Sequence, residues 1–217
     1  MKKLHAVLAT LSIVTACTGA NATEIYTGLG TSGLMLGMSH NLSPSLVVRG
    51  DVMAGLNLDR NGTREGVNYD GYLRSNRVGG FMDWFPFANG GFRMTGGLTL
   101  NQIKIGLNSS GNNASATING KPVNLTGETF NAELKFPQVT PYLGIGYGHQ
   151  PTKDTGFGFH MDIGVMVGRF NTSITTSLVG KQGITQADVD AAATSLSDSV
   201  SKLSVLPAAS IGVSYRF

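Results

Sequence analysis

Charge, cysteine and long apolar runs are all scarce in this sequence. Charged residues make up 13% of its 217 residues, about half of their share in an ordinary soluble domain. No run of residues approaches the 18 or so consecutive apolar side chains of a membrane-spanning helix, which excludes a helical membrane protein. Glycine is abundant instead, with 30 residues and only 7 prolines. This composition favours long strands that contain glycine.

The only cysteine, Cys17, lies in an amino-terminal stretch that is typical of a secretory leader. Two lysines precede a short apolar run and then a small-residue site, which is the pattern of a cleaved signal peptide. We therefore expect a signal peptide over 1–22 and a single barrel domain over 23–217, without thiols. An alternative is that residues 14–17 form a lipoprotein cleavage box, which would keep Cys17 as a lipidated amino terminus.

The mature chain is close to neutral. The leader holds Lys2 and Lys3 and no acidic residue, so 14 of the 16 basic residues remain against 13 acidic ones, a net charge of +1. This balance gives no support to a nucleic-acid partner.

The last residues, 204–217, carry the clearest strand pattern. Apolar side chains occupy the odd positions and small or polar ones the even positions, as in a strand with one apolar and one wet face. The segment exceeds the roughly 9–11 residues that a tilted strand needs to cross a bilayer, and it ends on an aromatic residue. It is predicted to be the closing strand of a transmembrane β-barrel.

Seven earlier segments alternate in the same way. Short turns follow the second, fourth and sixth strands and longer loops follow the third, fifth and seventh, as in outer-membrane barrels with both termini in the periplasm. We predict an all-β fold, an eight-stranded antiparallel up-and-down transmembrane β-barrel with a short helix in the last external loop. The strands are expected at 24–30, 33–39, 46–57, 72–87, from 92 onward, 138–149, 157–167 and 204–217, and the loops at 58–71, 109–136 and 176–203. In the fifth strand the alternation slips after Asn101, which we interpret as a bulge or as the strand leaving the bilayer.

Two of these loops show local structure. A hairpin is expected around Asn119 and Gly120 in the second. In the third, Thr185 and Asp188 resemble a capping box at a helix start. The helix that follows is amphipathic, so it could cover the barrel mouth or lie on a membrane surface. Its apolar side consists of Val189, Ala193, Leu196, Val200 and Leu203.

Aromatic residues cluster at the strand ends that this topology assigns to the periplasm. Such a girdle marks the membrane interface of a barrel, and the terminal aromatic strand is the expected assembly signal. The predicted girdle consists of Trp84, Phe85, Phe87, Phe92, Phe157, Phe159, Tyr215 and Phe217.

The opposite faces of the strands carry charges of both signs. An eight-stranded barrel is just wide enough for its side chains to fill it, so these charges could form an ion-pair network that plugs the interior. Alternatively, inward glycines could leave a narrow polar path whose selectivity the charges set. The candidates for the lining are Arg49, Asp51, Arg77, Asp83, Arg93, Tyr142, His160, Asp162 and Arg216.

Catalytic and metal-binding signals are weak. His160 and Asp162 share one strand face, but neighbours two apart are common, and a structural pair is favoured over a catalytic one. No metal-ligand spacing is present, so we expect no metal and no cofactor.

Several segments together resemble the small outer-membrane barrels of the OmpW and CarO type from Gram-negative bacteria. The resemblance implies an eight-stranded barrel in contact with outer-membrane lipids, inserted by the barrel-assembly machinery through its carboxy-terminal strand. It also implies passage of small hydrophobic molecules or of basic amino acids, although no ligand-binding residue carries over. The segments are 83–87 (DWFPF), 91–93 (GFR), 141–147 (PYLGIGY), the helix before the last strand, and 212–217 (GVSYRF).

Three functions are consistent with the sequence. The main hypothesis is a non-enzymatic outer-membrane barrel that serves as a narrow channel or facilitator for small solutes. The first alternative is a structural or surface-interaction barrel that works through its external loops. The second is an outer-membrane lipid-modifying enzyme that depends on His160.

Overall fold

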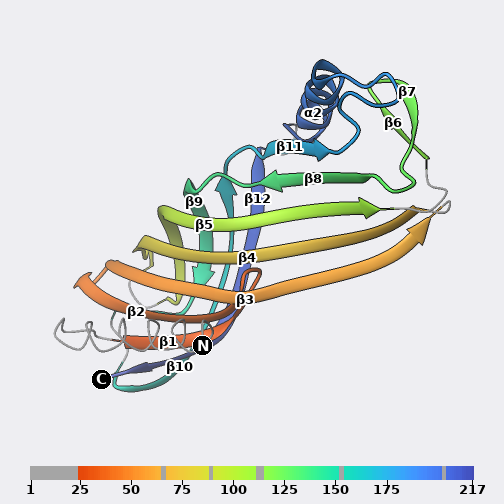
Figure 1. Ribbon diagram of the computed structural model, residues 1–217. Helices are drawn as coiled ribbons and strands as arrows, with labels where there is room; N and C mark the ends of the chain where they lie inside the picture. Colours follow the sequence, from red (N-terminus) through yellow and green to blue (C-terminus); the bar gives the residue numbers. More distant parts are fainter. Residues whose placement is uncertain (1–23, 65–66, 88–89, 111–114, 152–153, 202–203) are drawn as a thin grey trace.

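Twelve strands and one helix make up the part of the chain that the computed structural model describes, residues 24–64, 67–87, 90–110, 115–151, 154–201 and 204–217 (Figure 1). The predicted leader and its Cys17 lie outside these residues. The elements are β1 Glu24–Gly30, β2 Gly33–Ser43, β3 Leu46–Arg64, β4 Val67–Trp84, β5 Phe92–Ser110, β6 Ser115–Ile118, β7 Lys121–Asn124, β8 Thr129–Lys135, β9 Val139–Tyr147, β10 Gly156–Val167, β11 Asn171–Thr176, α2 Gln186–Ser201 and β12 Val205–Arg216.

Eight of the strands close into a ring. They pair in the order β5-β4-β3-β2-β1-β12-β10-β9, and β9 pairs back with β5. The first strand meets the last in an antiparallel ladder from Glu24 opposite Arg216 to Gly30 opposite Ser210. Closure leaves these strands without a free edge inside the ring. The predicted eight-stranded antiparallel barrel is confirmed.

The two faces of each strand differ as the alternation predicts. On β4, Val78 and Met82 are about half exposed on the outer face, whereas Arg77, Phe81 and Asp83 are buried on the inner face. Because successive side chains of a strand point to opposite sides, the barrel has an apolar outer surface and a filled interior.

Three strands continue far beyond the ring, at the end opposite the two termini (Figure 1). β3 and β4 stay paired from Leu56 opposite Ser75 to Arg64 opposite Val67, so the predicted loop over 58–71 is wrong. The outer part of β5 pairs with β8, and β11 pairs with the other side of β8. We call the described residues within 57–74, 104–135 and 171–201 the outer extension.

The break between ring and outer extension has a defined structure. Gly55, at a φ of 99°, lies at a bulge in β3, where the ladder to β4 shifts register. On β5 the partner changes from β9 to β8 around Pro137, with Asn101 N donating to Gln138 O and Phe136 N donating to Ile103 O. The predicted slip after Asn101 is not a bulge in β5, because the ladder from β5 to β4 keeps its register throughout. It marks the point where β5 leaves the ring and changes its partner. The ladder is interrupted instead in the neighbouring segment between β8 and β9, because Pro137 has no N–H group to donate to it.

The helix α2 begins at the predicted capping box. Thr185 N donates to Asp188 Oδ2 at 2.9 Å, and Asp188 N donates back to Thr185 Oγ1 at 3.3 Å. The apolar side of α2 is divided between two clusters: Val200 near its end packs against the apolar cluster inside the barrel, and Val189 near its start packs in an apolar cluster of the outer extension. No helix among the described residues is long and apolar enough to cross a membrane.

The outer extension has an apolar core of its own. β6 and β7 form the predicted hairpin, with Asn119 and Gly120 at positive φ in its turn, as tight hairpins require. Ion pairs surround the core, among them Lys121 with Asp188 at 2.7 Å. The core consists of Ile118, Val123, Leu125, Leu178, Ile184 and Val189.

Candidate functional site: the barrel interior

Two arginines and two aspartates form the centre of the polar part of the interior. Arg49 lies 2.6 Å from Asp83 and 3.2 Å from Asp162, and Arg93 lies 3.3 Å and 2.7 Å from the same two carboxylates. Each arginine therefore contacts both aspartates, and the charges balance. Removing one partner of such a buried set leaves an uncompensated charge, so the four side chains stabilise the interior as a unit.

Further ion pairs extend this network in both directions. Arg77 contacts Asp51 at 2.9 Å, and Arg216 contacts Glu24 at 2.8 Å near the two chain termini. Glu24 was not predicted to line the interior because only Thr23 separates it from the predicted leader, so no alternation precedes it. Its even number, shared with the inward Tyr26, was the signal available.

All nine side chains that the sequence placed in the interior are buried, with at most 5% of their surface exposed. Eight of them belong to the polar part, and Tyr142 packs with the apolar residues nearer the outer extension. The nine are Arg49, Asp51, Arg77, Asp83, Arg93, Tyr142, His160, Asp162 and Arg216.

The half of the interior that faces the outer extension is apolar. Its centre is Phe81 against Tyr142, whose ring centroids lie 5.0 Å apart. Val200 of α2 and Leu206 of β12 pack against the same cluster. The carboxy-terminal end of α2 therefore contacts this end of the interior. The cluster consists of Phe81, Ile103, Phe136, Tyr142, Met166, Phe170 and Ala208.

Inward glycines receive these aromatic rings. A Cβ at Gly79 or Gly97 would collide with the ring of Phe81, and one at Gly144 or Gly164 would collide with that of Tyr142. The glycines therefore leave no open path at these positions, because rings from neighbouring positions occupy the space.

A small cavity remains between the polar and the apolar half. Its volume of about 10 Å³ is enough for roughly one water molecule. Arg49, Arg77 and Asp162 line it on the polar side, and Phe81 and Tyr142 on the apolar side. Among the described residues, the interior at this level is filled by side chains.

The aromatic girdle lies on the outer face near the termini. Phe157 is 80% exposed, and its ring contacts Tyr215, which in turn contacts Phe217. Phe85 is an exception: it is buried at 3% exposure and does not belong to the girdle, because it continues the inward-facing odd positions of Phe81 and Asp83. The other predicted members on the outer face are Trp84, Phe87, Phe92 and Phe159.

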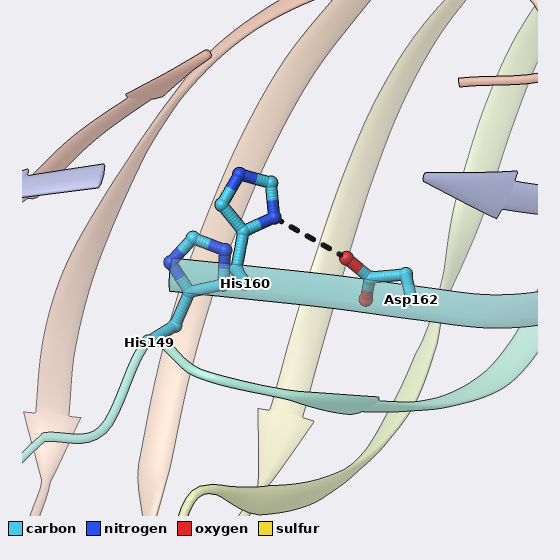
Figure 2. Close-up of side chains that lie close together, drawn as sticks. All are labelled: His149, His160 and Asp162. Carbon is cyan, nitrogen blue, oxygen red and sulfur yellow. Dashed lines mark ion pairs between the residues drawn. The ribbon is translucent and has the colours of Figure 1, made fainter. Parts of the chain in front are cut away.

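Two histidines and an aspartate meet at the polar end of the interior (Figure 2). His149 follows β9, where Gly148 and His149 both have positive φ. This turn brings His149 against His160, with ring centroids 4.6 Å apart, and both rings contact Tyr26. The sequence predicted no metal-ligand spacing, yet His149, His160 and Asp162 place three ligand-type atoms within 4.8 Å of one another.

Two solved structures have the same architecture. The chain matches a crystal structure of CarO from Acinetobacter baumannii with a TM-score of 0.61 and 17% identity, over 90% of this chain and 98% of that one. It matches the structure of CarO2 from the same organism with a TM-score of 0.61 and 18% identity, over 91% of this chain and all of that one. The chain has the CarO fold.

The CarO fold is an outer-membrane-barrel fold, as the sequence resemblance implied. At this level of identity the likeness concerns the fold alone. No family model and no curated protein sequence matches the chain. The roles of the buried charges therefore have to be argued from their own geometry.

Proposed function

We propose that this protein is a non-enzymatic outer-membrane barrel that works outside the cell, through its outer extension. The CarO fold, the apolar outer surface and the aromatic girdle support a place in the outer membrane. The predicted signal peptide supplies the export that this location requires. The barrel serves as the anchor, and the outer extension as the surface that meets a partner.

The closed interior supports an anchor more than a pore. Ion pairs fill the half near the termini, and an apolar cluster fills the other half. A solute that passed through would have to separate buried charges and then displace the rings of Phe81 and Tyr142. Each of these steps costs several kcal/mol.

The ordered outer extension is the observation that carries the proposal. A connecting loop needs neither an apolar core nor a network of ion pairs, because loops run over the surface and remain mobile. Here Leu178 and Ile184 are buried at no more than 1% exposure, and Lys181 is tied to Glu128 at 2.8 Å. Such rigidity suits a binding surface, since a preorganised surface loses less entropy on binding.

Trimming the outer extension tests the proposal. The ladders allow three short hairpins, which join Leu56 to Ser75, Lys104 to Lys135 and Val167 to Val205, because each of these pairs is already opposed. Bacteria that carry the trimmed barrel are compared with wild type for adhesion to an epithelial monolayer and for self-aggregation. We expect the bacteria with the trimmed barrel to lose either adhesion or self-aggregation. The trimmed barrel should still fold, as measured by its heat-modifiable shift, the difference in gel migration between unheated and heated protein. Unchanged adhesion and aggregation would reject the proposal.

A second candidate is the narrow channel or facilitator for small solutes. The cavity beside Arg49, Asp51 and Arg77 favours it, because it places charges of both signs in the middle of the barrel. Passage would then require the apolar half to open. Uptake of labelled lysine into liposomes tests this: uptake by wild-type protein above that of empty liposomes supports the channel, and equal uptake removes it.

A further inference from the structure

The group of His149, His160 and Asp162 has the chemistry of a transition-metal site. Their ligand-type atoms all lie within 4.8 Å of one another, and all three side chains are buried. Imidazole nitrogen and carboxylate oxygen are the ligands that zinc and its neighbours in the first row prefer. The three come from one turn, at His149, and one strand, β10.

His149 already has a carboxylate on the ring nitrogen that would face away from a metal ion. Its Nδ1 bonds to Oε1 of Glu24, and Glu24 is itself held by Arg216 at 2.8 Å. A carboxylate on one ring nitrogen fixes the tautomer and leaves the other nitrogen as an electron-pair donor. That other nitrogen, Nε2, is buried and has no hydrogen-bond partner among the described residues. In Figure 2 it lies on the side of the ring toward His160.

His160 and Asp162 supply the other two ligand-type atoms of the group. His160 Nδ1 faces Asp162 Oδ2 at 3.9 Å, which is too long for a hydrogen bond. Two ligand atoms each about 2.0–2.2 Å from one zinc ion lie roughly 3–4 Å apart. Within the described part of the chain, neither ring nitrogen of His160 has a hydrogen-bond partner, although the side chain is fully buried. A bound ion would provide one for Nδ1.

The arginines nearby decide which ion fits. Arg49 and Arg93 both bind Oδ1 of Asp162, and Ser210 Oγ donates to Oδ2 at 3.4 Å, so Oδ2 is the oxygen left for a metal. Their positive charges disfavour an ion that relies on carboxylates alone, such as Mg²⁺ or Ca²⁺. The two arginine charges are compatible with an ion that binds imidazole and carries an anionic fourth ligand such as hydroxide or chloride.

We propose that the barrel binds one late first-row divalent cation, of which Zn²⁺ is the representative, through His149 Nε2, His160 Nδ1 and Asp162 Oδ2. Glu24 orients His149 from behind. The site lies inside the barrel near the chain termini and does not depend on the outer extension. It is therefore independent of the function proposed above.

Zinc binding by the mature protein, folded in detergent without a histidine tag, tests the site. We expect one Zn²⁺ per chain after gel filtration, and a Co²⁺ form whose visible spectrum shows nitrogen coordination. Mg²⁺ and Ca²⁺ should not compete. Changing His149→Ala or His160→Ala should abolish stoichiometric binding, and E24Q should weaken it roughly 10–100-fold. His40→Ala is the matched control, because His40 is the third histidine of the mature chain and lies exposed on β2.

Each outcome of the zinc-binding experiment either supports or overturns the proposed site. Stoichiometric zinc that survives in the His40 variant and is lost in the His149 and His160 variants supports the site, provided that all variants keep the heat-modifiable shift. Absence of bound zinc in the folded wild-type protein overturns the proposal even if the variants fail to fold. Equal loss in the His40 variant overturns it as well, because that would indicate binding at the surface.

Discussion

Arg49 Nε lies 2.6 Å from Asp83 Oδ2 inside the barrel, and neither side chain is more than 2% exposed. The two residues belong to the neighbouring strands β3 and β4 but stand two positions apart in the ladder, since Arg49 opposes Phe81 and Asp83 opposes Val47. The pair therefore runs diagonally across the inner face. It links the two strands where each would otherwise bury an isolated charge.

The Asp83→Asn variant should lose about 3–5 kcal/mol of unfolding free energy. The change keeps the shape of the side chain but leaves Arg49 and Arg93 with Asp162 as their remaining shared carboxylate. Urea unfolding in detergent micelles, followed by the fluorescence of the single tryptophan Trp84, measures the loss. The control is Asp59→Asn in the exposed pair with Arg74, where less than about 1 kcal/mol is expected. Equal losses in both variants would contradict the account of a cooperative buried network.

The Phe81→Ala variant should lose about 3–5 kcal/mol of unfolding free energy, because it removes the ring that fills the space above Gly79 and Gly97. Phe159→Ala is the control, because this ring lies on the outer face and is 49% exposed. Denaturation in micelles compares the two. A loss in the Phe81 variant no larger than in the Phe159 variant would show that the apolar half is not close-packed.

The outer extension should loosen in acid before the barrel opens. Lys121 and the hydrogen bonds from Thr185 and Asn119 hold the pKa of Asp188 well below its ordinary value. The stability that this carboxylate contributes is therefore fully present above its ordinary pKa of about 3.9 and is lost as the pH falls toward the lower folded value. We expect the circular-dichroism signal of α2 at 222 nm to melt at progressively lower temperature below that pH.

Asp188→Asn should remove most of this acid dependence. Asp190→Asn, on the same helix but exposed and bonded to Gln186, should leave it intact. If the melting temperature of α2 in the Asp188 variant follows pH as it does in wild type, the sensitivity lies elsewhere.

Removal of Phe217 should slow insertion into the outer membrane, because we expect the assembly machinery to recognise the terminal aromatic strand. β12 pairs with both β1 and β10, so its placement also closes the ring. The folded fraction in outer-membrane preparations measures the effect, with Phe157→Ala as an aromatic control away from the terminus. Normal assembly without Phe217 would rule out this signal.

The ring was predictable from sequence, because one face of each of its strands meets an apolar environment and the other face does not. The outer extension was not. In 58–71 and in β11, polar side chains occupy both strand faces, so the alternation that identifies a membrane strand is absent. Partner strands beyond the ring stabilise these segments, and single-sequence periodicity does not show such partners.

The residues of the candidate site also divide into those that the strand alternation predicts and those that it does not. Arg49, Asp83 and Asp162 followed from strand parity, since each lies within a regular strand. His149 did not, because the odd positions of β9 face outward and parity would have placed its ring there. The positive φ values at Gly148 and His149 reverse the chain and bring the ring inside. A pattern with a period of two cannot anticipate such a turn.

Current through a planar lipid bilayer that contains the purified, folded wild-type protein is the most direct test of the closed barrel. The ion pairs around Arg49 and the cluster around Phe81 predict no stepwise conductance at any moderate voltage. Stable conductance steps from wild-type protein, at a frequency that rises with the amount of protein added, would contradict the account.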